Sequence, residues 1–73
     1  MFLLKLFLLD LVLLPLNQLL KLVGLCDSGG IGKQIVASGE VWVDGAQELR
    51  KTAKIRAGQV VRVGDVEIRV EAD

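Results

Sequence analysis

The sequence has no histidine and a single cysteine, Cys26. One thiol cannot form an internal disulfide, and without histidine the usual zinc ligand sets cannot be assembled. The absence of histidine also removes the commonest general base of enzymes. We therefore expect no metal, no cofactor and no catalysis, and the lone thiol fits a reducing cytoplasm.

An excess of charge of either sign is also missing. Nine basic residues stand against nine acidic ones, so the formal net charge is +0. The 73 residues, 52% of them hydrophobic, predict one folded domain over residues 1–73 with a modest core. Any case for nucleic-acid binding must therefore depend on where the basic residues lie.

Uninterrupted apolar runs are lacking too, although residues 1–25 are rich in leucine. A transmembrane helix needs about 20 consecutive apolar residues, and Asp10, Pro15 and Lys21 interrupt this stretch. The segment is interpreted as a buried first strand and first helix, with no membrane partner expected. An alternative stays open, in which the atypical start at residues 1–13 is a protein-interaction or membrane-surface module.

Two helices are predicted after this start. Residues 7–14 are expected to form a strand that ends at Pro15, and the apolar spacing of residues 16, 19, 20 and 23 then indicates a helix that stops at Gly24. Asp27 and Ser28 predict the cap of a second helix over about residues 29–38. Its apolar stripe is expected at Ile31 and Ile35 with Val36 beside it, which leaves Lys33 in solvent.

The second half of the chain reads as strands and tight turns. Residues 41–43 precede Asp44-Gly45, a strong hairpin signal. Residues 60–63 and 66–70 flank Gly64-Asp65, and a turn there pairs residue 63 with 66, 62 with 67 and 61 with 68. This register places the apolar side chains on one face and an opposite-charge pair on the other, as a half-buried hairpin requires.

A glycine cluster at residues 28–34 invites comparison with nucleotide-binding loops. A phosphate loop of the Walker type requires glycine where Asp27 stands and a hydroxyl residue where Gln34 stands. The dinucleotide fingerprint fails as well, because Ile35 occupies its third glycine position. Neither nucleotide hydrolysis nor dinucleotide binding is therefore expected.

A weaker role for the same glycines is retained. The N–H groups of Gly29 and Gly30 at a helix start could hold one phosphate, with Lys33 one turn later as a cation. Alternatively, the glycines simply allow the helix to pack closely on its neighbour. Composition and spacing do not decide between these two interpretations.

The basic stretch at residues 50–56 is the main functional candidate. It carries Arg50, Lys51, Lys54 and Arg56 and contains no acid. Such runs are usually solvated faces, but clustered cations also neutralise phosphates and release counterions. Trp42 alternates out of phase with its valine neighbours, so it either faces solvent and could stack on a base or covers apolar surface at the sheet edge.

Residues 16–63 resemble a known family. The motifs, in order, are Leu19-Leu20-Lys21-Leu22-Val23-Gly24, Ser28-Gly29-Gly30, Lys33, Gly39-Glu40-Val41-Trp42-Val43-Asp44-Gly45, Glu48, Arg50-Lys51, Lys54-Ile55 and Ala57-Gly58-Gln59. They are similar to the RNA-binding domain named after ribosomal small-subunit protein four, also called the alpha-L RNA-binding motif, and to its short single-domain bacterial branch, the YbcJ-like proteins.

The resemblance implies an α+β fold, with two N-terminal helices packed on a small, mostly antiparallel sheet of about four to five strands. It also implies that structured RNA, ribosomal or transfer RNA, lies across the second helix and the following hairpin. Ribosomal particles are therefore among the candidate partners. Carried over by position, the contacting residues are Lys33, Arg50, Lys51 and Lys54.

Overall fold

The computed structural model describes residues 2–9 and 12–73 and contains two helices and seven strands in that part of the chain. The elements are β1 (Phe2–Leu8), β2 (Leu14–Pro15), α1 (Leu16–Leu22), α2 (Gly29–Ala37), β3 (Val41–Val43), β4 (Ala46–Gln47), β5 (Lys54–Ile55), β6 (Val60–Val63) and β7 (Val66–Ala72). The α+β class is as expected, and two strands, β1 and β2, precede the helices where the sequence predicted one.

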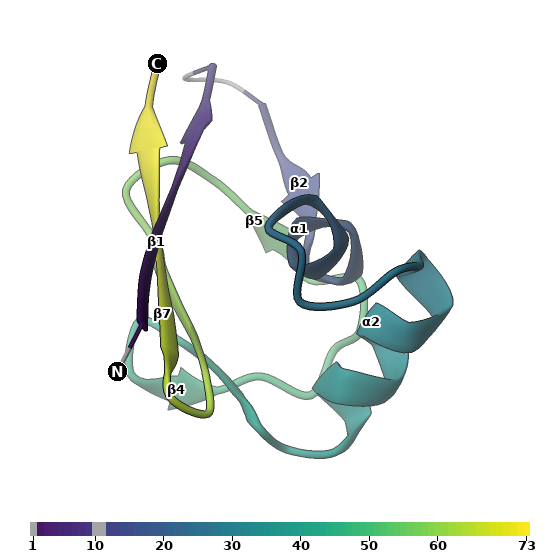
Figure 1. Ribbon diagram of the computed structural model, residues 1–73. Coiled ribbons are helices and arrows are strands. Elements are labelled where there is room, and N and C mark those ends of the chain that lie inside the picture. The colour runs from purple at the N-terminus through teal and green to yellow at the C-terminus, as the bar shows by residue number, and fades with distance from the viewer. Residues whose placement is uncertain (1, 10–11) are drawn as a thin grey trace.

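Five of the strands form one sheet in the order β1-β7-β6-β3-β4. Only β1 and β7 are parallel in this sheet, and the other neighbours are antiparallel. The strands β2 and β5 form a separate antiparallel pair. Figure 1 shows α1 and α2 on one side of the large sheet, so the sheet has one covered face and one outer face.

The predicted hairpin register is confirmed at each of its three pairs, 63 with 66, 62 with 67 and 61 with 68. The turn between β3 and β4 also lies where Asp44-Gly45 predicted it. Both turn residues have positive φ, 51° at Asp44 and 84° at Gly45. Two consecutive positive φ values suit the twist of a tight hairpin, which is why this dipeptide favours such turns.

Helix α1 begins and ends where the sequence predicted. Pro15 precedes its first residue, and Gly24 follows it with φ +84°. The Gly24 N–H donates to the Lys21 carbonyl at 3.1 Å and the Leu25 N–H to the Leu20 carbonyl at 3.0 Å. This is the pattern that satisfies the last carbonyls of a helix beyond a left-handed glycine.

Helix α2 is capped as expected but buries a different stripe. The Ser28 hydroxyl accepts a hydrogen bond from the Ile31 N–H at 3.2 Å. The fully buried positions are Gly32 and Val36, whereas Ile31 is 43% exposed and Ile35 is half-buried. The predicted stripe is therefore wrong at Ile31, whereas Val36 is buried and Ile35 packs against the core. The helix meets α1 through Gly32, and a glycine carries no hydrophobic side chain for the sequence pattern to reveal.

The predicted strand at residues 7–14 is also wrong in its bounds. The chain forms β1 at Phe2–Leu8 and β2 at Leu14–Pro15, and residues 10 and 11 of the predicted strand lie outside the described part. Strand β1 depends on β7, a partner more than sixty positions away. A run of leucines shows no alternation of apolar and polar residues, so its strand limits cannot be read from a period of two.

The core lies between the helices and the covered face of the sheet. Its buried members are Leu16, Leu19, Leu20, Val36, Val41, Ala53, Ile55, Val61, Val63, Ile68 and Val70. Leucines of β1 at positions 4, 6 and 8 pack against them from the sheet edge. Across the described residues, neither helix has the length and apolar character to cross a membrane.

Candidate nucleic-acid interface

Three separate segments meet at the start of α1. The Leu16 N–H donates to the Ala53 carbonyl at 2.8 Å, and the Asn17 N–H donates to the Lys51 carbonyl at 3.2 Å. The first N–H groups of a helix lack partners within it, so the basic stretch supplies acceptors for them. These bonds hold residues 51–53 against α1.

Asn17 also joins the start of α2 to this junction. Its side chain is 4% exposed, and its Nδ2 donates to the Gly29 carbonyl at 3.3 Å. Its Oδ1 is buried without a hydrogen-bond partner among the described residues. One buried residue therefore contacts both the basic stretch and the first residue of α2.

The glycines of α2 allow this close approach. A Cβ at Gly32 would lie 2.5 Å from the Asn17 backbone oxygen, and one at Gly29 would lie 2.6 Å from Nε2 of Gln18. A Cβ at Gly30 would meet only the Ser28 hydroxyl oxygen, at 3.8 Å. The packing interpretation therefore holds for Gly32, while Gly30 lies at the open end of the helix.

The predicted cations are exposed, and they lie on α2 and on the stretch that contacts the start of α1. Lys33 lies one helical turn after Gly29 on α2, and Lys54 is in β5, opposite Pro15 of β2. Lys51 and Arg56 are exposed as well. Within the described part of the chain, none of these four forms an ion pair.

Arg50 differs because an acid holds its side chain. Its Nε and Nη2 donate to the Glu48 carboxylate at 3.1 and 2.9 Å, and the Arg50 side chain remains 81% exposed. These hydrogen bonds hold the pKa of the Glu48 carboxyl below its ordinary value and raise the pKa of the Arg50 guanidinium. An exposed pair of this kind contributes little to stability, so a phosphate could replace the carboxylate.

Trp42 does not lie with these cations. In β3 it pairs with Gln47 of β4 and Arg62 of β6, on the outer face of the sheet, and it is 43% exposed. The sequence left open whether Trp42 faces solvent or covers apolar surface, and in the structure its side chain alternates with the buried Val41 and remains partly covered. The helices cover the opposite face, so the structure separates Trp42 from Lys33 and the basic stretch.

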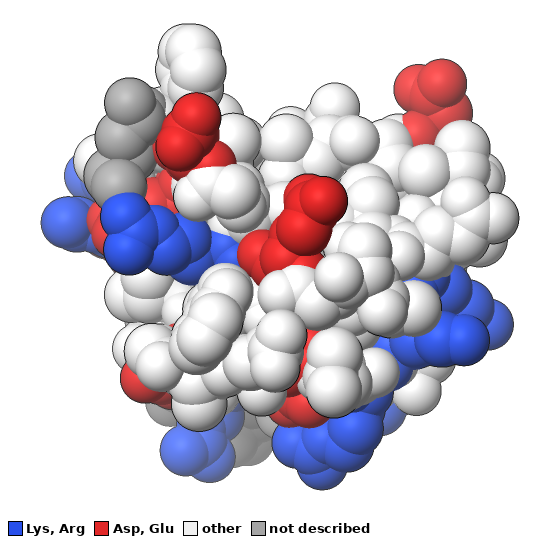
Figure 2. Space-filling view, turned by 90° about the horizontal axis from the view of Figure 1, so that it is seen from below, with Lys and Arg blue, Asp and Glu red and all other residues white. Residues whose placement is uncertain are grey.

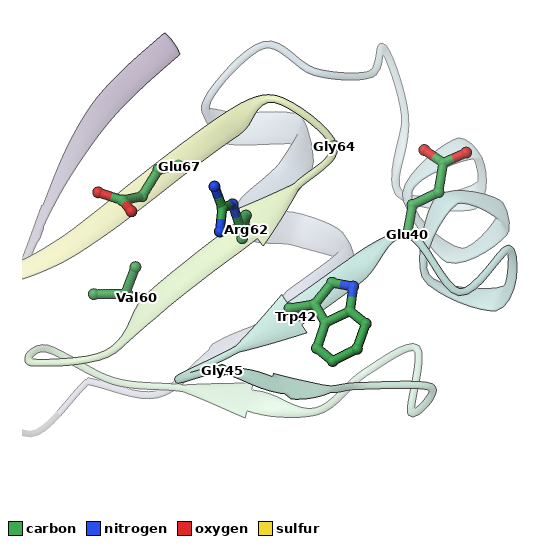
Figure 3. Close-up of a pocket in the computed structure, with 7 residues that line it drawn as sticks. All are labelled: Glu40, Trp42, Gly45, Val60, Arg62, Gly64 and Glu67. Atoms are coloured by element: carbon green, nitrogen blue, oxygen red, sulfur yellow. The ribbon is translucent and has the colours of Figure 1, made fainter. Parts of the chain in front are cut away.

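The outer face carries a cavity of about 540 Å³ that the sequence did not predict. It is lined by Glu40, Trp42, Gly45, Val60, Arg62, Gly64 and Glu67. Figure 3 shows the Arg62 side chain between Glu67 and Trp42. Two features of the sequence pointed to this cavity: the predicted opposite-charge pair at residues 62 and 67, and the alternation of Trp42 with its valine neighbours. Two carboxylates against one guanidinium make this cavity a poor site for a phosphate.

The charges over the whole surface are mixed. Figure 2 shows basic side chains at the margins of the face seen from below, with acidic ones between them. This view agrees with the net charge of +0. A polyanion would therefore find cations only locally, and the junction at the start of α1 is such a place.

Comparisons with known proteins relate most of the chain to one family. The family model of the S4 domain matches residues 9–71. YbcJ of Escherichia coli strain K12, whose name describes it provisionally as RNA-binding, is 47% identical over 57 residues, covering 78% of this chain and 81% of the relative. YbcJ of Shigella flexneri, described as uncharacterized, matches to the same extent.

A solved structure extends the likeness to three dimensions. The solution structure of E. coli YbcJ, described as revealing an alpha-L motif involved in RNA binding, superposes with a TM-score of 0.73 at 41% sequence identity. The match covers 93% of this chain and 86% of that chain. The resemblance noted in the sequence is therefore confirmed in fold.

Proposed function

The chain belongs to the S4 domain family, and on that premise we propose that it binds structured RNA, of the ribosomal or transfer type, without catalysing a reaction. The proposed contact surface, here called the junction surface, consists of Gly29, Gly30, Lys33, Arg50, Lys51, Lys54 and Arg56. Trp42 is left outside it because it lies on the other side of the sheet.

The observation that carries the proposal is the junction at Asn17. Its backbone and side chain contact Lys51 and Gly29 within hydrogen-bond distance, so the basic stretch and the start of α2 are held as one unit. Cations held on a folded surface lose little freedom when they meet a phosphate, which favours binding. The buried position of Asn17 keeps that arrangement independent of the RNA.

The expected mode of recognition is contact with phosphates and RNA shape. The junction surface offers ammonium and guanidinium groups and helix N–H groups, all of which bind phosphate oxygens. RNA helices hide their base edges in a narrow major groove, so folded RNA is recognised largely through shape and backbone. Because the chain has no net charge, we expect it to bind phosphates only where several cations lie close together.

The test measures binding to a folded transfer RNA and a ribosomal RNA hairpin across a salt series. Replacing Lys33, Lys51, Lys54 or Arg56 by alanine should each reduce the slope of log affinity against log salt by about 1. Arg50→Ala should reduce it by less, because Glu48 already neutralises part of that charge.

Arg69→Ala serves as the matched control. Arg69 is exposed in β7 and donates to Glu67 at 3.0 Å, on the outer face of the sheet. This change should leave the salt slope unaltered. If the fourfold variant lacking Lys33, Lys51, Lys54 and Arg56 binds both RNAs with unaltered affinity and slope, the junction surface is not the RNA site.

A further inference from the structure

Strand β1 forms an open edge of the large sheet. It stands at the end of the strand order, next to β7, and spans seven residues, Phe2–Leu8. Figure 1 shows β1 beside β7, with both helices on the other side of the molecule. The opposite edge strand, β4, has only two residues. The sheet thus exposes one long edge.

The direction of the backbone groups along β1 follows from its pairing with β7. The Phe2 N–H donates to the Asp65 carbonyl at 2.8 Å, and the Leu8 carbonyl accepts from the Asp73 N–H at 2.7 Å. Even-numbered residues of β1 therefore point their polar groups toward β7. Because these groups alternate along a strand, the N–H and C=O groups of residues 3, 5 and 7 point to the open side.

The side chains along this edge are apolar and exposed. Phe2 is 71% exposed, Leu3 49%, Phe7 56% and Leu9 64%. Lys5 is the single charged residue among residues 2–9. Natural sheets rarely leave a long apolar edge open, because its free N–H and C=O groups pair with any available strand. The edge therefore has the chemistry of a surface that another strand covers.

We propose that β1 pairs antiparallel with β1 of a second copy of this chain about a two-fold axis, joining the two sheets. A two-fold contact uses the same patch on both copies, and an edge strand is self-complementary in this sense. The strand spans about 23 Å at ~3.3 Å per residue, and the longest dimension of the molecule is 29 Å. A contact along β1 would therefore extend over most of the length of the molecule. The chain's net charge of +0 means that the two copies do not repel each other.

Three registers pair at least two of the open residues 3, 5 and 7 with one another, and Lys5 selects among these three. Full overlap places Lys5 opposite Lys5 of the other copy, and like charges directly opposite each other are destabilising. A shift that places Leu4 on the axis puts Lys5 opposite Leu3 and leaves Phe7 without a partner. A shift the other way places Leu6 on the axis and Lys5 over the ring of Phe7, a favourable cation–aromatic contact. The third register is the one proposed.

This inference does not rest on RNA binding. The junction surface lies on the helix side of the molecule, and the open edge lies at the far end of the sheet. The leucine-rich start, which the sequence left open as an interaction surface, would then serve contacts between copies. Loss of dimerisation would leave the RNA proposal intact, and the reverse also holds.

The test is sedimentation of the full chain over a range of micromolar concentrations, with an expected mass of twice 7.9 kDa. Lys5→Pro removes an N–H that points outward, so it should produce monomers while the β1–β7 bonds and the circular dichroism spectrum persist. Phe7→Lys should do the same, because in the proposed register it places a lysine directly opposite Lys5 of the other copy. Leu22→Glu is the matched control, since Leu22 is an exposed leucine in α1, and this variant should remain dimeric.

Disulfide trapping tests the register in a Cys26→Ser background. The residue on the axis faces itself at about 4.5 Å between Cα atoms, within disulfide range. Leu6→Cys should therefore cross-link on oxidation, whereas Leu4→Cys should not. A chain that stays monomeric at every concentration, or a dimer that survives both Lys5→Pro and Phe7→Lys, would overturn the proposal. A monomer that floats with phosphatidylglycerol vesicles would overturn it in favour of a membrane surface.

Discussion

Gly32 is the residue at which one atom decides how closely the two helices pack. Its backbone lies against the backbone of Asn17, and a Cβ there would stand 2.5 Å from the Asn17 oxygen. Glycine normally weakens a helix interior by about 1 kcal/mol relative to alanine. Here that cost is offset by an approach that no other residue permits, and the approach brings the start of α2 to Asn17.

Gly32→Ala is expected to lower the free energy of unfolding by about 1–3 kcal/mol, because backbone atoms cannot move aside as a flexible side chain can. Gly30→Ala is the matched change in the same helix. The space there is open, so it should raise the free energy of unfolding by about 0.5–1 kcal/mol. Urea unfolding measures both, and a neutral Gly32→Ala would show that the helices are not in backbone contact.

Among the elements, the β3–β4 hairpin is held in position by hydrogen bonds from its turn to the beginning of β6. The Asp44 carboxylate accepts from the Val60 N–H at 2.9 Å and from Nε2 of Gln59 at 3.2 Å. The Asp44 N–H in turn donates to the Val60 carbonyl at 2.8 Å. The turn residue therefore also holds the beginning of β6, and a hairpin made of three- and two-residue strands gains stability from that attachment.

Asp44→Ala is expected to cost about 1–2 kcal/mol, since it removes both side-chain hydrogen bonds and places alanine at φ 51°. Asp44→Asn should cost less, because asparagine tolerates positive φ and keeps one acceptor oxygen. Urea unfolding with both variants separates the two contributions. Equal losses for alanine and asparagine would show that the carboxylate charge matters more than the conformation.

At the scale of the whole molecule, the two faces of the sheet have different chemistry. The helix side carries the proposed junction surface, and the outer face carries Trp42 with Arg62 and Glu67. The molecule is neutral in total, so RNA binding of the proposed kind depends on a local cluster of cations. RNA bound on the helix side and RNA bound on the outer face should therefore have different effects on Trp42.

The protein contains one tryptophan and no tyrosine, so its fluorescence reports Trp42 alone. Folded RNA bound at the junction surface should leave the emission intensity and the acrylamide quenching of Trp42 unchanged, because the sheet separates the two sites. The measurement is a fluorescence titration at low salt, with single-stranded RNA as the comparison. Strong quenching at stoichiometric folded RNA would place a base on Trp42 and extend the interface to the outer face.

The sequence alone determined the features that arise between neighbours in the chain. The caps at Ser28 and Gly24, the Asp44-Gly45 turn and the register around Gly64-Asp65 depend on residues a few positions apart, whose conformational preferences are readable directly. The candidate cations were also readable, because charge is a property of the residue itself. Their exposure followed from the same local patterns.

Only the tertiary structure decided which distant segments meet. The pairing of β1 with β7, the contact of residues 51–53 with the start of α1, and the approach of Gly32 to Asn17 join parts of the chain far apart in sequence. Trp42 was separated from the cations for the same reason. Such contacts depend on the shape and burial of all the packed elements together, and neither leucine nor glycine carries a local signal of its partner.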